Sequence, residues 1–260
     1  MPTVRLDDRA LISVQGPDAR SFLQGLLTQD VDSLESGELR YGALLGPQGR
    51  LLADLFLLGE PEGILLDCRA EQRDALLQRL SLYRLRANVR LAADDRSVFA
   101  AWGTDMAGWP ADPRLPNLGR RFYGAVVPNQ ATDDWRKRQL DLGVPSSEDF
   151  RLDVDYPIEC NLDLLNGIAF HKGCFVGQEV TSRMKRRGKV KSRLLPVSFD
   201  GPPPSFGQEV LRGDLRAGEI RSSCDGRGMA LLRLDRLDGS LTVEGQRVQV
   251  HIPDWLDLAG

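Results

Sequence analysis

The sequence predicts an α+β protein that ends in a small all-β domain. Before residue 200, short apolar runs separated by glycine and proline turns alternate with stretches of helical periodicity, which is typical of antiparallel sheets mixed with helices. Three consecutive prolines follow Gly201, and the interior of a strand or helix does not accommodate them. Beyond the prolines, only strand-like segments occur.

These features divide the chain into residues 1–200 and 201–260. We expect the first part to contain two interleaved α+β modules, the inner one covering about 40–95. The second part has the length of a small β-barrel.

The N-terminal part should begin with a strand at residues 10–14 and a helix that starts at Gly16-Pro17-Asp18, because proline suits a first helical turn and aspartate its positive end. Apolar runs at 43–45, 51–58 and 64–66 are separated by turn residues and predict hairpins. A helix with Leu76, Leu77, Leu80 and Tyr83 facing inward should follow.

Further strands are expected at 84–91, 97–102 and 122–127, with an irregular, proline-rich loop at 103–119. A helix is expected at 132–142, capped by Thr132 or Asp133. The C-terminal strands are predicted at 209–211, 218–221, 229–234 and 241–251.

The composition excludes several classes of protein. Hydrophobic residues make up 42% and charged residues 27% of the chain, as in ordinary globular proteins, and the net charge of −3 gives no global reason to expect nucleic acid. No apolar run approaches the roughly 20 residues of a membrane span. Because no basic flank leads into an apolar segment at the N-terminus, we expect a cytosolic protein.

The segment from Asn166 to Arg183 carries the most chemical information. Gly173 and Gly177 bracket Cys174, and Lys172 lies two residues before the thiol. Positive charge or a helix N-terminus favours a thiolate, so Cys174 is the candidate for a reactive or ligating thiol. An inert packing thiol is the alternative.

Two other features leave alternatives open. Glu179 either binds a donor-rich ligand or pairs with Arg183 at helical i, i+4 spacing. The run from Lys185 to Arg193 holds six positive charges in nine residues. It contacts phosphates of RNA or carboxylates of a ligand, or it is a solvated strand edge on which lysines discourage pairing.

The stretch Lys172-Gly173-Cys174-Phe175-Val176-Gly177-Gln178-Glu179 resembles the Lys-Gly-Cys-(Tyr/Phe)-x-Gly-Gln-Glu signature of the YgfZ/CAF17 family. Residues 15–31, residues 156–163 and the strand 218–223 resemble other parts of that family. The resemblance therefore extends over most of the chain.

The resemblance implies a fold like that of the glycine-cleavage T-protein, with modules around a central folate channel and a C-terminal barrel. It also implies bound tetrahydrofolate and a role in assembling or repairing iron–sulfur clusters of client enzymes, tRNA-modifying enzymes among them. By position, the signature residues would line the channel, with Cys174 and Lys172 as the chemically active pair and Gly173, Gly177, Gln178, Glu179 and Arg183 as contacts.

Arg50 and Asp54 fall where aminomethyltransferases carry an acidic pair, and one member of that pair is Ala53 in this chain. The resemblance thus favours a folate-binding iron–sulfur assembly factor. A folate-dependent aminomethyltransferase and an RNA- or protein-binding module that uses Lys185 to Arg193 are the alternatives. One thiol cannot hold a cluster alone, so Cys174 would be a transient ligand that shares the cluster with assembly factors, clients or glutathione.

Overall fold

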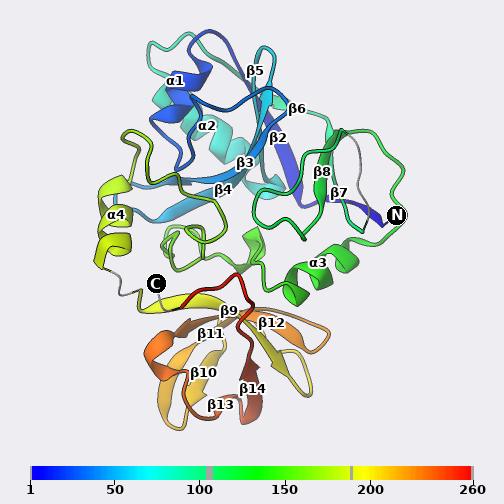
Figure 1. Cartoon of the computed structure of the whole chain (residues 1–260), viewed down its shortest axis with the longest axis vertical. Coiled ribbons are helices and arrows are strands. Elements are labelled where there is room, and N and C mark those ends of the chain that lie inside the picture. Colours follow the sequence, from blue (N-terminus) through cyan, green and yellow to red (C-terminus); the bar gives the residue numbers. More distant parts are fainter. Residues whose placement is uncertain (1, 104–107, 188–189, 259–260) are drawn as a thin grey trace.

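The structure, a computed structural model, describes residues 2–103, 108–187 and 190–258. Its helices and strands form a five-stranded sheet, a three-stranded sheet and a closed barrel (Figure 1). In chain order these elements are β1 (Thr3–Arg5), β2 (Arg9–Gln15), α1 (Ala19–Gln24), β3 (Leu39–Leu45), β4 (Leu51–Glu60), β5 (Gly63–Arg69), α2 (Arg73–Arg84), β6 (Arg90–Asp94), β7 (Ser97–Ala101), β8 (Arg120–Gly124), α3 (Thr132–Asp141), α4 (Gln178–Arg187), β9 (Ser192–Phe199), β10 (Glu209–Arg212), β11 (Leu215–Cys224), β12 (Arg227–Arg233), β13 (Leu241–Val243) and β14 (Gln246–Val250).

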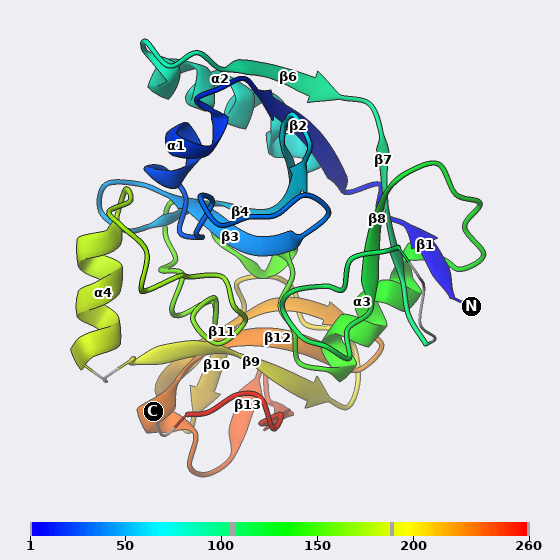
Figure 2. The same cartoon turned by 45° about the horizontal axis from the view of Figure 1, so that its top comes forward.

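The five-stranded sheet is antiparallel and has the order β3-β4-β5-β2-β6. Helices α1 and α2 lie over one of its faces (Figure 2). Side chains alternate between the faces of a strand, so Ala53 and Leu55 of β4 join the core beneath the helices. Asp54 and Phe56 point to the opposite face, where Phe56 joins a second core.

The second core joins the parts of the molecule. We call the sheet face that points away from α1 and α2 the lower face. The second core packs this face against the antiparallel sheet β1-β7-β8, helix α3 and the irregular segment that precedes α4. Leu194 and Met229 of the barrel belong to the same core. The barrel is therefore packed against the rest of the chain through continuous apolar contact.

The barrel has the strand order β10-β11-β12-β9-β14-β13 and an apolar interior that includes Leu195, Val210 and Val248. Its strand β9 lies before the boundary that we set at Gly201. The three prolines lie in the connection from β9 to β10, within the barrel, where no ladder hydrogen bond is needed. The five-stranded sheet likewise begins at β2, well before residue 40.

Most predicted elements are confirmed, including the helices near 19–24, 73–84 and 132–141. The strand predicted at 84–91 is wrong, because α2 continues to Arg84 and the chain then turns at Leu85, whose φ is 45°. The strand predicted at 241–251 is split by a turn in which Glu244 and Gly245 have φ values of 48° and 78°.

The predicted cap of α3 is also wrong. Thr132 is the first helical residue, and its hydroxyl donates to the carbonyl oxygen of Arg5 at 3.1 Å instead of capping the helix. In the expected loop at 103–119, residues 104–107 lie outside the described residues, and the remainder forms turns and a single bridge. None of the described helices combines the length and the apolar character that a membrane crossing requires.

Candidate functional site

Cys174 lies in an irregular loop, residues 166–177, that leads into α4. The loop rests on the segment that follows α1. The Ala169 amide donates to the Thr28 carbonyl oxygen at 2.9 Å, and the Val176 amide donates to the Gly25 carbonyl oxygen at 3.3 Å. The loop is therefore anchored by backbone hydrogen bonds on both sides of the cysteine.

Lys172 strengthens this attachment. Its ammonium group donates to the carbonyl oxygens of Gln24, Leu27 and Gln29, each at 2.7 Å. Burial lowers the pKa of Lys172 to about 8. An ammonium has three N–H donors, and here all three are used by the backbone. The geometry thus shows that Lys172 anchors the loop, and its thiol-activating role stays a prediction.

Cys174 itself is exposed, whereas the neighbouring Phe175 is 7% exposed and packs in the core. The other thiols have different surroundings. Burial raises the pKa of Cys68 to about 12 and holds the pKa of Cys160 well above its ordinary value. Cys224 is half-buried, and burial raises its pKa as well. Of the four cysteines, Cys174 is the one that a molecule in solution can reach freely.

The two glycines that bracket the cysteine differ in their surroundings. Gly177 has a φ of +80°, and a Cβ atom there would lie 2.8 Å from the carbonyl oxygen of Gly46. This glycine therefore lets the start of α4 approach the hairpin turn at 46–49. Gly173 faces open space and has no such constraint.

The remaining signature residues lie at the surface. Gln178 is the first residue of α4 and is partly exposed. The Glu179 carboxylate accepts a hydrogen bond from the Arg183 guanidinium at 2.7 Å, with the two side chains 81% and 56% exposed. The ion-pair alternative for these two residues is thus the one that the structure displays, and neither side chain lines a cavity with Asp54.

The basic run divides in the structure. Arg193 is 6% exposed and pairs with Asp163 at 2.9 Å, and Lys185 lies 3.5 Å from the same carboxylate. Residues 188–189 lie outside the described residues. Arg193 therefore faces inward, whereas Lys185, Arg186 and Lys191 are exposed among the described residues of the run.

No three His, Cys, Asp or Glu side chains gather to hold a metal ion in the ranges that the structure describes. A cluster bound at Cys174 would therefore need its other ligands from outside those ranges or from another molecule, because a cluster takes several protein ligands.

Asp54 lies in a closed site on the lower face of the five-stranded sheet. One carboxylate oxygen accepts the Ser147 hydroxyl hydrogen bond at 2.6 Å. The other lies 3.6 Å from an Arg9 nitrogen and 3.5 Å from the Tyr41 hydroxyl. Asp54 is only 3% exposed. Its hydrogen-bonding capacity is thus largely taken up by the protein's own side chains.

Around Asp54 a network of buried ion pairs fills the space between the sheets. Arg9 donates to Asp67 at 2.6 Å, and Arg121 donates to the same carboxylate at 2.7 Å. Arg121 also pairs with Asp112 and lies over the ring of Phe56 at 3.6 Å. Buried charges of this kind are costly to separate, so the network favours a fixed arrangement.

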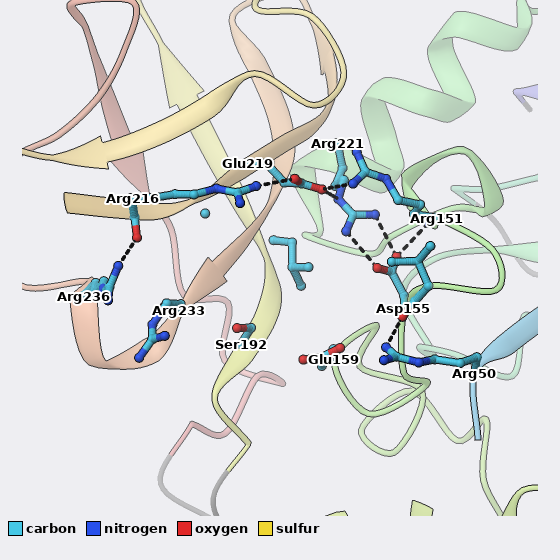
Figure 3. Close-up of a pocket in the computed structure, with 13 residues that line it drawn as sticks. Arg50, Arg151, Asp155, Glu159, Ser192, Arg216, Glu219, Arg221, Arg233 and Arg236 are labelled. Atoms are coloured by element: carbon cyan, nitrogen blue, oxygen red, sulfur yellow. Dashed lines mark hydrogen bonds and ion pairs between the residues drawn. The ribbon is translucent and has the colours of Figure 1, made fainter. Parts of the chain in front are cut away.

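Arg50 does not share a site with Asp54. Its guanidinium stacks on the ring of Tyr156 at 3.7 Å and donates to the carbonyl oxygen of Val154. It lines a groove between the main body and the barrel (Figure 3), which Asp54 does not reach.

Two protein-family descriptions match different parts of the chain. Residues 8–105 match the family described as the GCVT N-terminal domain. Residues 191–258 match the CAF17 C-terminal beta-barrel domain. This match begins one residue before Ser192, where β9 begins the barrel.

Relatives with curated names cover nearly the whole chain. The iron–sulfur cluster assembly factor IBA57 of Mus musculus is 33% identical over 303 aligned residues, which cover 96% of this chain and 84% of the relative. The chain belongs to the IBA57 family of iron–sulfur cluster assembly factors. The human IBA57 protein is 32% identical over 299 residues, with the same coverage.

A solved structure defines the fold of this IBA57-family chain. The aminomethyltransferase T of the glycine cleavage system from Bartonella henselae superposes with a TM-score of 0.75 at 15% identity, covering 98% of this chain and 86% of that one. The fold is therefore T-protein-like, as predicted. At this level of identity the similarity extends to the fold alone.

The prediction of a cytosolic protein is wrong. The IBA57 relatives of mouse, human and Coccidioides immitis are all named mitochondrial, which points to mitochondria rather than the cytosol. Our prediction depended on features missing from the first residues, and a missing signal does not identify a compartment.

Bound tetrahydrofolate is an expectation from the sequence resemblance, and the residues around Asp54 leave little room for it. The cavity that Asp54 borders has a volume of about 190 Å³. Pockets for small molecules occupy roughly 300–1,000 Å³. Ala53, at the position of the second acid, packs in the core beneath α2. Arg9, Ser147 and Tyr41 all contact the Asp54 carboxylate. A pterin beside Asp54 would therefore find little room and few free acceptor positions on that carboxylate.

Proposed function

We propose that this protein assembles iron–sulfur clusters by contributing Cys174 as one thiolate ligand of a cluster that it shares with a partner molecule. The thiol would lose its proton to solvent and bind iron through sulfur, and the partner would supply the other ligands. The observation that carries the proposal is an exposed cysteine on a loop anchored at both ends.

The anchoring supports this role because a shared ligand must be presented in a fixed position. Lys172 and the backbone hydrogen bonds of Ala169 and Val176 hold the loop, while the thiol stays open to solvent. A buried thiol such as Cys160 cannot meet a partner.

The alternatives receive less support. Aminomethyl transfer needs a folate held beside a free acid, and Asp54 is bound by Ser147 and Arg9. RNA binding through residues 185–193 would lack one of the six cations, because Arg193 is buried against Asp163.

The proposal is tested in cells that lack this protein and carry either the Cys174→Ser or the Cys224→Ser variant at equal abundance. We expect Cys174→Ser to leave several iron–sulfur enzymes with low activity, and Cys224→Ser to restore them. Full enzyme activities with Cys174→Ser would reject the role of that thiol.

A further inference from the structure

The groove between the barrel and the main body is unusually rich in arginine for a protein whose net charge is −3. It has a volume of about 400 Å³, and six arginines and three carboxylates line it, giving a formal charge of +3. Figure 3 shows Arg216, Arg233 and Arg236 on the barrel side and Arg50 on the opposite side. We call this the arginine groove.

Part of this positive charge is already balanced. Arg221 pairs with Asp155 through both of its terminal nitrogens, at 2.7 and 2.8 Å. Glu219 accepts contacts from Arg151 at 3.2 Å and from Arg216 at 2.8 Å. These pairs fix the groove walls and leave little net charge on its Asp155 side.

Two other arginines keep their charge. In the described part of the chain, the hydrogen bonds of Arg50 and Arg236 go to backbone carbonyl oxygens, those of Val154 and Arg216. A carbonyl oxygen does not neutralise a guanidinium, which remains charged at every physiological pH. The third lining acid is Glu159, whose pKa is raised by burial and lowered by the charges of Arg50 and Arg221.

The groove lies next to the segment that carries Cys174. A Cβ atom on Gly49 would lie 2.9 Å from the Val180 side chain, so the residue before Arg50 touches the first turn of α4. Ser192 also lines the groove, and it begins β9, the strand that follows α4 in the chain. A partner seated in the groove would therefore extend toward the loop that presents the thiol.

We infer that the arginine groove binds a carboxylate-rich segment of a partner protein. Guanidinium groups match carboxylates with paired hydrogen bonds, and Val154 and Leu231 provide apolar contact between them. Single-stranded nucleic acid fits less well, because it binds by stacking bases on open aromatic rings. No aromatic side chain is among the described residues that line the groove, and Arg50 covers Tyr156.

This inference rests on the proposed function in one respect: the partner whose acidic segment enters the groove is taken to be the one that shares a cluster with Cys174.

The test uses a fluorescein-labelled hexaglutamate peptide, titrated with the full chain at low ionic strength and followed by anisotropy. The groove variant carries Arg50→Gln and Arg236→Gln. The matched control carries Arg86→Gln and Arg247→Gln, two exposed positions outside the groove with the same change of charge.

We expect the groove variant to bind hexaglutamate about tenfold more weakly and the control to bind within about twofold of the parent. Cys174→Ser should bind like the parent, so a failure of the cluster proposal leaves this result intact. Equal weakening in both double variants would overturn the inference. The inference would also be overturned if a labelled hexauridylate bound the parent as tightly as hexaglutamate and the groove variant weakened both by the same factor. That result would identify a nucleic-acid site instead.

Both substituted arginines are partly exposed, so the fold should survive. If the groove variant nevertheless melts early, Arg50→Lys with Arg236→Lys replaces it, because lysine keeps the charge and loses the paired donors. About threefold weaker binding is expected for that variant. Unchanged binding would overturn the inference.

Discussion

The ammonium group of Lys172 lies 2.7 Å from the carbonyl oxygen of Leu27, a residue 145 positions earlier in the chain. The contact joins two motifs that look independent in the sequence, the one that contains Cys174 and the one that follows α1. It explains why a lysine precedes the cysteine, since three aligned carbonyl oxygens suit an ammonium group and an arginine fork would not fit them. Lys172 thus acts on Cys174 through the position of the loop.

Removing this anchor should destabilise the protein. Lys172→Met keeps the aliphatic stem but leaves three carbonyl oxygens without their donor, so we expect the free energy of unfolding to fall by about 2–3 kcal/mol. Urea denaturation measures the change. The control is Lys191→Met at an exposed position, which should stay within about 0.5 kcal/mol of the parent. Equal stabilities of the two variants would show that the Lys172 contacts are not formed.

The glycines of the signature provide a second matched pair. Gly177→Ala forces a side chain into a φ of +80° and against the carbonyl oxygen of Gly46, so we expect a loss of about 2–4 kcal/mol. Gly173→Ala places its methyl group in open space and should change stability by less than about 1 kcal/mol. Thermal melting compares them, and a reversed order would contradict the packing of α4 on the hairpin turn.

The thiols should differ in reactivity as their surroundings differ. At pH 7.5 iodoacetamide is expected to label Cys174 before the other cysteines, because alkylation needs an accessible thiolate. The pKa of Cys68, raised by burial to about 12, keeps that thiol protonated over the whole range below pH 11. Mass spectrometry of the native protein reports the order. Labelling of Cys68 or Cys160 at the rate of Cys174 would mean that the core opens.

Asp54 should behave as a structural residue. Asp54→Ala leaves the Arg9 charge and the Ser147 hydroxyl without an acceptor, so we expect a loss of stability of about 3–5 kcal/mol. Tetrahydrofolate should neither quench the tryptophan fluorescence nor raise the melting temperature of the parent protein, because the cavity is small and its acceptors are occupied. Saturable quenching that Asp54→Ala abolishes, with the fold intact, would restore the folate prediction.

Local patterns in the sequence were sufficient for most of the fold. The apolar spacing around Leu76 and Leu80 and the turns at 46–49 and 59–63 fixed the helix and hairpins of the main sheet. Where the pattern misled, the side chains were apolar but exposed. Leu85 is 88% exposed, so its hydrophobicity contributed to the strand predicted at 84–91, which the chain does not form.

The site was predictable only in part. The motif identified Cys174, but the partners of Lys172 and Asp54 are backbone atoms and side chains distant in sequence, which no local pattern reports. Arg9 and Asp67 did leave a signal: charged residues in apolar strands must be paired when buried, and here they are paired with each other. The arginine groove left none, since its residues come from five separate segments.

The central claim is that Cys174 is a cluster ligand, and anaerobic reconstitution tests it most directly. The parent, Cys174→Ser and Cys224→Ser proteins are each incubated with iron, sulfide and glutathione as the thiol co-ligand, and desalted. Visible charge-transfer absorption and protein-bound iron are then measured. We predict a cluster in the parent and in Cys224→Ser and none in Cys174→Ser. Equal iron content and absorption in Cys174→Ser would contradict the claim.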